Sequence, residues 1–179
     1  MFIDLGASIG NISTKFAEEN PEFEIFAFEV NKALESRLAA VKEPLGERFH
    51  YYMVASWIVN GYVRLDKTDH YMASTILTGK SEPDGWKPID YDAYESVPCI
   101  DVSSWIAEQF KIGDEIVLKM DVEGAEYQII QKLIYDGMIF RLSKLICEWR
   151  AALFPHRPAE EHDMTYSKAA KCVPLVDWV

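Results

Sequence analysis

The sequence lacks any apolar run close to the roughly 20 residues that a membrane-spanning helix needs. It is also poor in basic residues, with 18 lysines and arginines against 29 aspartates and glutamates, which gives a formal net charge of −11. A field of that sign repels a phosphate backbone, and no basic stripe offsets it. We therefore expect neither a nucleic acid nor a membrane as a partner.

Cysteine is scarce as well, because only Cys99, Cys147 and Cys172 are present and they are far apart. This usage favours a reduced, cytoplasmic location in which cysteines serve as small hydrophobic residues. No basic-then-apolar leader precedes the first strand-like segment, which agrees with that location. No cysteines and histidines have zinc-ligand spacing, so no metal is expected.

What the sequence does have is an apolar core, with 49% hydrophobic and 13% aromatic residues in a chain of 179. That length and composition suit one domain over residues 1–179. Short segments that are apolar throughout alternate with amphipathic ones, which predicts an α/β fold with three layers and a mostly parallel central sheet. We expect strands at 2–5, 24–29, 49–55, 97–100, 116–120 and 145–149, a last strand near the end of the chain, and helices at 11–19, 31–41, 101–110 and 129–137.

Two segments interrupt the alternation. Asn60 and Gly61 lie between two β-rich runs in "SWIVNGYVRL", which predicts a tight hairpin. Residues 66–96 are polar but rich in aromatics, and so long a segment with little periodicity predicts a functional lid rather than an idle linker. Its aromatic side chains could cover a sugar or a flat acceptor, or could pack within the loop; they are Tyr71, Trp86, Tyr91 and Tyr94.

Ligands of a parallel sheet bind beyond the carboxyl ends of its strands. After the first strand the sequence reads D-x-G-x-x-x-G, from Asp4 to Gly10, and not the G-x-G-x-x-G of a dinucleotide site. The missing Cβ of Gly6 lets a ligand approach the main chain, and Gly10 lets the next helix pack closely. Asp4 can anchor the turn or accept a ligand hydrogen bond. A plain strand-to-helix turn is the alternative.

Glu29 follows the second strand, nineteen residues beyond Gly10. That is close to the distance expected for an acidic residue that holds ribose hydroxyls. Its carboxylate can accept hydrogen bonds from both hydroxyls of the sugar. The alternative is an acidic residue that interacts favourably with the dipole of the next helix.

Four charged residues gather in "KMDVEGAE", where a buried strand meets a helix. The helix dipole accounts for Glu123 and Glu126. It does not account for Lys119 next to Asp121 inside an apolar strand, because buried charges need partners. An ion pair or a site for a polar ligand explains both residues.

Together, "FIDLGASIGN", "FAFEVN" and "IVLKMDVEGAEYQII" resemble the FkbM family of S-adenosylmethionine-dependent methyltransferases. The family-like pieces "VASWIVNGYVRL", "ASTIL" and "CIDVSSWI" follow in order, so the resemblance covers residues 2–149. It implies a Rossmann-like class I methyltransferase fold. Because the chain starts at the first strand and is short after Arg150, we expect it to lack the leading helix and part of the C-terminal hairpin of that fold.

The resemblance also implies roles for individual residues. The loop from Asp4 to Gly10 would hold the methionine part and the sugar of S-adenosylmethionine, and Glu29 would bind the ribose hydroxyls. The implied cofactor-binding residues are Asp4, Gly6, Ala7, Ser8, Gly10, Asn11, Glu29, Val30, Asn31, Ala55, Ser56 and Asp121, with Val54 beside them. Asp121, Glu123 and Lys119 would form the catalytic set. Ser74 and Thr75, in the long loop, match a serine-rich patch of the family and would face the pocket.

The implied reaction is O-methylation of a hydroxyl on a small molecule or a carbohydrate. A base should take the hydroxyl proton, with Asp121 the first candidate, Glu123 the second and His70 the third. Too few ligands surround Asp121 and Glu123 for a divalent metal to be expected. Two alternatives stay open: an NAD-dependent oxidoreductase, which the missing G-x-G-x-x-G and the "KMDVEGAE" block disfavour, and a cofactor-binding fragment without turnover. The sequence does not indicate an oligomeric state.

Overall fold

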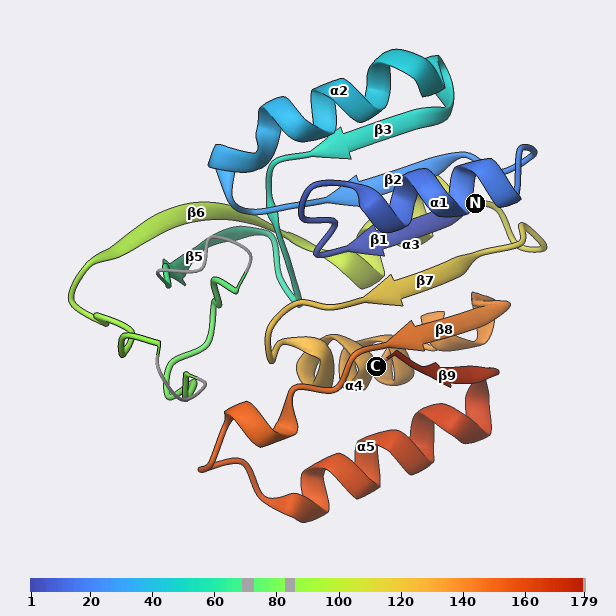
Figure 1. Cartoon of the computed structure of the whole chain (residues 1–179). Coiled ribbons are helices and arrows are strands. Elements are labelled where there is room, and N and C mark those ends of the chain that lie inside the picture. Colours follow the sequence, from blue (N-terminus) through green and yellow to red (C-terminus); the bar gives the residue numbers. More distant parts are fainter. Residues whose placement is uncertain (69–72, 83–85, 179) are drawn as a thin grey trace.

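The computed structural model describes residues 1–68, 73–82 and 86–178, and its centre is a six-stranded parallel sheet (Figure 1). The strand order is β3-β2-β1-β7-β8-β9, and neighbouring strands pair in parallel throughout. The strands are β1 (Phe2–Leu5), β2 (Ile25–Phe28), β3 (Phe49–Tyr52), β7 (Val117–Met120), β8 (Lys144–Cys147) and β9 (Leu175–Asp177). The predicted α/β fold with a mostly parallel central sheet is confirmed.

Helices cover both faces of this sheet. Successive strand residues point to opposite sides, and the strands are apolar on both sides, so each face needs a cover. Phe2 of β1 packs in the core beneath α1 and α2, whereas Ile3 packs in the core beneath α3 and α4. The helices are α1 (Asn11–Glu19), α2 (Glu35–Leu45), α3 (Val102–Gln109), α4 (Glu126–Tyr135) and α5 (Ala159–Cys172). The short 3₁₀ helices are η1 (Lys32–Leu34), η2 (Gly46–Arg48), η3 (Met138–Arg141) and η4 (Ala151–Leu153).

Local capping explains where two of these helices begin. The side chain of Asn31 accepts a hydrogen bond from the backbone N–H of Ala33, and that of Asp101 accepts one from Ser104. Both residues are short and polar, as N-caps usually are. The caps predicted at Asn31 and Asp101 are therefore confirmed.

The predicted hairpin at Asn60 and Gly61 is wrong. A second sheet holds β4 (Ala55–Trp57), β5 (Gly61–Asp66) and β6 (Tyr94–Asp101) in the order β4-β6-β5, so β6 lies between the two runs. β4 pairs in parallel with β6, and β5 pairs with β6 in the antiparallel sense. The Asn60 side chain accepts a hydrogen bond from the backbone N–H of Asp101 at 2.9 Å, so the Asn-Gly turn crosses the end of β6 instead of closing a hairpin.

Two other predicted segments also differ from the structure. The apolar run at 49–55 divides between two sheets, because β3 ends at Tyr52 and β4 starts at Ala55. The segment expected at 66–96 is shorter, since β5 extends to Asp66 and β6 starts at Tyr94. His70 and Tyr71 lie outside the described residues.

The end of the described chain adds a parallel strand, since β9 pairs with β8 in parallel and not as part of an antiparallel hairpin. None of the helices in the described part of the chain has the length and apolar character needed to cross a membrane. β5, most of β6 and the described residues between these two strands lie beyond the carboxyl ends of the central strands (Figure 1).

Candidate functional site

A cavity of about 420 Å³ opens at the carboxyl edge of the central sheet, and we call it the edge cavity. Its size falls in the range of roughly 300–1,000 Å³ that is usual for small-molecule sites. The predicted site residues that line it are Gly6, Ser8, Glu29, Val30, Ala55, Ser56, Asp121 and Glu123, together with Val54 and Ser74. The residues that line it without having been predicted are Phe28, Ala73, Ile76, Lys80, Val122, Arg150 and Leu153.

The remaining predicted site residues that the structure describes are not among those that line the edge cavity; they are Asp4, Ala7, Gly10, Asn11, Asn31, Thr75 and Lys119. Asn11 starts α1, and Asn31 caps η1. Gly10 has φ of +83°, and a Cβ at this position would lie 2.9 Å from Val41 of α2. Gly10 thus permits close packing between helices, as the sequence predicted.

Gly6 forms the floor of the edge cavity where the chain leaves β1. Its φ is +77°, and a Cβ built on it would lie 1.8 Å from the carbonyl oxygen of Asp121. The two strand ends approach this closely because the backbone N–H of Asp121 also donates to Leu5 at 3.0 Å. Only glycine fits there, so main chain instead of a side chain is presented to a ligand.

Glu29 is held by backbone amides from both sides. The N–H of Ser8 donates to one carboxylate oxygen and the N–H of Asn31 to the other, each at 2.8 Å. Burial raises the pKa of Glu29, although these amide hydrogen bonds act in the opposite direction. Each carboxylate oxygen has two lone pairs, so both can still accept a bond from a ligand in the cavity.

Beneath the Gly6 loop lies a buried ion pair between β1 and β7. Lys119 Nζ is 2.9 Å from Asp4 Oδ1 and donates to the carbonyl of Gly6 at 2.8 Å. Ser13 donates to the other Asp4 oxygen at 2.7 Å. Burial lowers the pKa of Lys119, but Asp4 and Asp121 outweigh this effect and leave the pKa raised. This pair explains the charges inside apolar strands, and it supports the loop from below.

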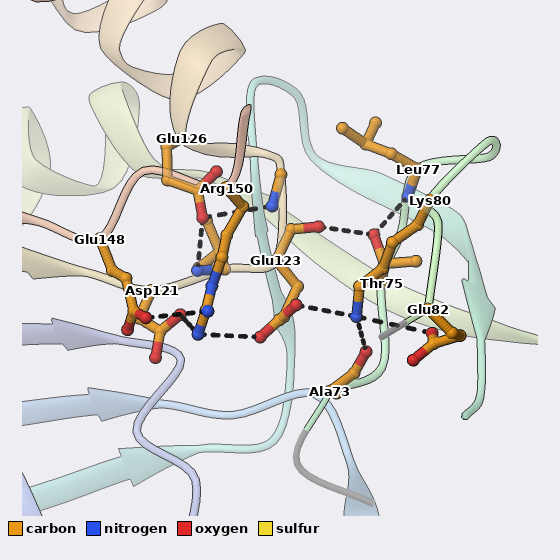
Figure 2. A network of polar contacts seen from close by, with 12 residues as sticks. Ala73, Thr75, Leu77, Lys80, Glu82, Asp121, Glu123, Glu126, Glu148 and Arg150 are labelled. Carbon is orange, nitrogen blue, oxygen red and sulfur yellow. Dashed lines mark hydrogen bonds and ion pairs between the residues drawn. The ribbon is translucent and has the colours of Figure 1, made fainter. Parts of the chain in front are cut away.

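Arg150 joins three carboxylates at the opposite wall (Figure 2). Its Nη2 lies 3.1 Å from Asp121 Oδ1 and 3.3 Å from Glu123 Oε1, and its Nη1 lies 2.8 Å from Glu148. Asp121 and Glu123 follow β7, whereas Glu148 and Arg150 follow β8. Neighbouring parallel strands therefore deliver all four charges to one place.

The loop after β7 is shaped by Glu126 from within α4. Its Oε1 accepts hydrogen bonds from the N–H groups of Val122 at 3.0 Å and Gly124 at 3.2 Å. Glu123, between them, has a φ of +54°, a conformation that is uncommon for a residue with a side chain. The two amide bonds stabilise this turn, which directs the Glu123 side chain into the edge cavity.

Residues 73–82, which we call the cover segment, attach to the same turn. Thr75 Oγ1 donates to the carbonyl of Glu123 at 2.8 Å, and Lys80 Nζ lies 2.8 Å from the Glu123 carboxylate (Figure 2). Lys80 also donates to the carbonyl of Ala73 at 2.6 Å. Glu123 therefore fixes the cover segment through its backbone and through its side chain.

Several aromatic residues of the predicted lid have separate positions. Trp86 lines the edge cavity. Tyr91 donates to the carbonyl of Lys80 at 3.1 Å, and the Arg64 guanidinium lies 4.5 Å from the ring centre of Tyr94. Of these three side chains, Trp86 alone is placed to contact a ligand.

Three serine hydroxyls in the cavity wall, those of Ser8, Ser56 and Ser74, are buried and have no hydrogen-bond partner among the described residues. Buried hydroxyls are normally bonded, so these groups mark places where a polar ligand or water fits. The described residues contain no group of three or more His, Cys, Asp or Glu side chains placed to hold a metal ion.

Arg150, Glu148 and Lys80 are the polar residues that sequence reasoning missed. Glu148 and Arg150 had a usable signal, because they stand at the carboxyl end of the apolar strand predicted at 145–149. Lys80 had none, because it lies in an aperiodic loop and reaches Glu123 only through tertiary folding.

One comparison with known proteins gives a match. A family model described as the methyltransferase FkbM domain matches residues 4–167. No curated protein and no solved structure matches this chain.

Proposed function

This chain belongs to the FkbM methyltransferase family, and we propose that it uses S-adenosylmethionine to methylate a hydroxyl of a small molecule or a carbohydrate. The observation that carries the proposal is the edge cavity, which has Glu29, Gly6 and Asp121 together in its wall. These residues come from the ends of β1, β2 and β7, far apart in the sequence.

The residues in the wall fit this cofactor. Glu29 can accept from the two ribose hydroxyls, and the unpartnered hydroxyls of Ser8 and Ser56 can bond its polar groups. Asp121 and Glu123 provide negative charge for a cationic sulfur. When bound, S-adenosylmethionine supplies an electrophilic methyl group on a positively charged sulfur.

The chain's own residues would orient the acceptor and receive its proton. Ser74 and Trp86 line the edge cavity and supply a polar and an aromatic contact for an acceptor. Holding two reactants in line contributes about 7–11 kcal/mol in favourable cases. Asp121 is the candidate base, and a placed base typically adds about 10²–10⁴-fold. Arg150 fixes the carboxylate of Asp121 at 3.1 Å.

We further propose a cytoplasmic protein with a small-molecule or carbohydrate partner and without nucleic-acid or membrane partners. All three cysteines are unpaired, which supports a reducing location. The net charge of −11 disfavours phosphate-rich partners.

Thermal unfolding with S-adenosylhomocysteine, and separately with NAD, tests the cofactor. At 100 times its dissociation constant a ligand adds about 2.7 kcal/mol of stability, so we expect a clear rise in Tm with S-adenosylhomocysteine. Stabilisation by NAD alone would instead support the oxidoreductase. Stabilisation by S-adenosylhomocysteine without transfer to any member of a glycan and metabolite panel would support the fragment.

Glu29→Gln tests the ribose contact. Glutamine keeps one oxygen for the amides around it but loses the charge and one acceptor site. We expect S-adenosylhomocysteine to bind at least about tenfold more weakly, because one hydrogen bond to a charged group is worth about 1.5–3 kcal/mol. Titration calorimetry measures the affinity, with Glu108→Gln on the exposed surface of α3 as the control. Equal affinity in Glu29→Gln and the native protein would contradict the assignment.

A further inference from the structure

Glu148 is a carboxyl group behind the cavity wall to which the proposed function gives no task. It stands directly after β8, and its backbone N–H donates to the carbonyl of Met120 at the end of β7 at 2.9 Å. Its side chain is 21% exposed and is not among those that line the edge cavity. Glu148 therefore acts on a ligand only through the side chains beside it.

Asp121 is one of these side chains. Arg150 clamps the two carboxyl groups, with Nη2 at 3.1 Å from Asp121 and Nη1 at 2.8 Å from Glu148 (Figure 2). One guanidinium therefore holds the two carboxyl groups side by side, and the charge of Asp121 acts on Glu148. Carboxylates have no donor, so a bond between the two requires that one of them holds a proton.

The surrounding charges favour retention of that proton. Asp121 and Glu123 face Glu148 from the loop after β7, and Arg150 and Lys119 oppose them. Burial, followed by the charge of Asp121, raises the pKa of Glu148 to about 7, although Arg150 acts in the opposite direction. The pair is thus able to gain and lose a proton near neutral pH.

We propose that Asp121 and Glu148 form a shared-proton carboxyl pair that takes up the proton of the acceptor hydroxyl, with Arg150 as its positioning residue. This inference rests on the proposed function. The step starts from the ionised pair: the O–H bond of the acceptor breaks, and its proton passes to Asp121 and on to Glu148. The acceptor oxygen forms a bond to the methyl carbon, and the electrons of the broken C–S bond stay on sulfur, which becomes neutral. The proton then leaves to solvent from the partly exposed Glu148.

The shared proton should also affect cofactor binding, which can be measured without the methyl acceptor. A cation beside the pair favours its ionised form and so lowers its affinity for protons. Cationic S-adenosylmethionine should therefore release protons when it binds near pH 7, whereas neutral S-adenosylhomocysteine should release fewer. A group with a pKa of about 7 is about half protonated at pH 7, so it can release at most about half a proton there.

Titration calorimetry at pH 7 in two buffers with different ionisation enthalpies measures this release. We expect a few tenths of a proton more with S-adenosylmethionine than with S-adenosylhomocysteine in the native protein. Glu148→Gln, which keeps the size of the side chain but cannot titrate, should abolish the difference. Glu108→Gln makes the same change on the exposed surface of α3 and should retain it. Equal proton release in Glu148→Gln and the native protein would overturn the inference.

A second measurement keeps the inference separate from the proposed function. If neither ligand binds, the proposed function fails. Carbon-13 NMR of labelled glutamate carboxyls still measures the protonation of Glu148 in the free protein. The Glu148 signal, identified by its loss in Glu148→Gln, should titrate near pH 7 and shift to lower pH in Asp121→Asn. A Glu148 midpoint that Asp121→Asn leaves unchanged would reject the pair, whatever the cofactor.

Discussion

Among the described glycines, Gly6 has the least room for a side chain. Its φ of +77° nearly equals the +74° of Gly137, but a Cβ on Gly6 would lie 1.8 Å from Asp121 O, whereas no atom lies within 4 Å of one on Gly137. The two glycines share one backbone requirement and differ in their surroundings. They therefore separate the cost of a left-handed backbone from the cost of a clash at the cavity floor.

Gly6→Ala should destabilise the protein much more than Gly137→Ala. The left-handed backbone costs alanine about 1–2 kcal/mol at either position, and at Gly6 the clash adds about 1–3 kcal/mol. Gly6→Ala should also weaken the binding of S-adenosylhomocysteine, because relief of the clash moves the Asp121 loop. Urea unfolding of both variants measures the free energies. Equal losses would mean that the loop yields without cost.

The residues that could be predicted from the sequence are those that directly follow strands. Gly6, Glu29 and Asp121 each stand at the end of an apolar run, and parallel pairing brings such ends to one edge. Arg150 also follows a predicted strand, so its position could have been predicted, although its pairing with Glu123 could not. Lys80 could not be predicted, because it reaches Glu123 from an aperiodic loop more than 40 residues away.

At the scale of elements, the cover segment depends on a buried ion pair. The Lys80–Glu123 distance of 2.8 Å resembles the 2.7 Å between Lys67 and Glu95 on the surface. The side chains of the first pair are 1% and 11% exposed, and those of the second are 44% and 55% exposed. Buried pairs cost much to break on one side, whereas exposed pairs contribute little.

Double-mutant cycles on the two pairs should therefore differ. Lys80→Met should cost about 1–3 kcal/mol, because the buried Glu123 carboxylate keeps Arg150 but loses its other cationic partner, and the addition of Glu123→Gln should recover part of that loss. The matching cycle on Lys67→Met and Glu95→Gln should give a coupling below about 1 kcal/mol. Urea unfolding of each single and double variant provides the energies. Similar coupling in both cycles would show that the cover segment is not held by this pair.

Sequence patterns located the elements well but not all of their partners. The parallel sheet could be predicted because strands that are apolar on both faces must be covered by helices. The prediction of a hairpin failed because a turn signal such as Asn60-Gly61 indicates that the chain reverses. It does not indicate which strand pairs with the strands on either side of the turn. Here β6, which starts more than 30 residues later, takes the position between β4 and β5.

At the scale of the whole molecule, acidic residues outnumber basic ones, and some carboxyl groups are buried where charge is costly. Glu126 is 0% exposed, and its Oε2 has no hydrogen-bond partner among the described residues. Burial, together with the charge of Asp121, raises its pKa from 4.5 to about 7, although backbone hydrogen bonds oppose the shift. The folded protein thus binds a proton at Glu126 more tightly than the unfolded chain does.

Such a group makes global stability depend on pH with a definite sign. Its contribution is fully present below pH 4.5 and is lost as pH rises through about 7, with a total of at most about 3 kcal/mol. Glu126→Gln mimics the neutral form and keeps an oxygen for Val122 and Gly124, so it should match the native protein at pH 5 and exceed its stability at pH 8. Urea unfolding from pH 5 to 8 measures the difference, to which Glu148 contributes equally in both proteins. Glu108→Gln on the surface of α3 is the control, and its free energy of unfolding should differ from that of the native protein by an amount that does not vary with pH. A pH-independent difference for Glu126→Gln would contradict the raised pKa.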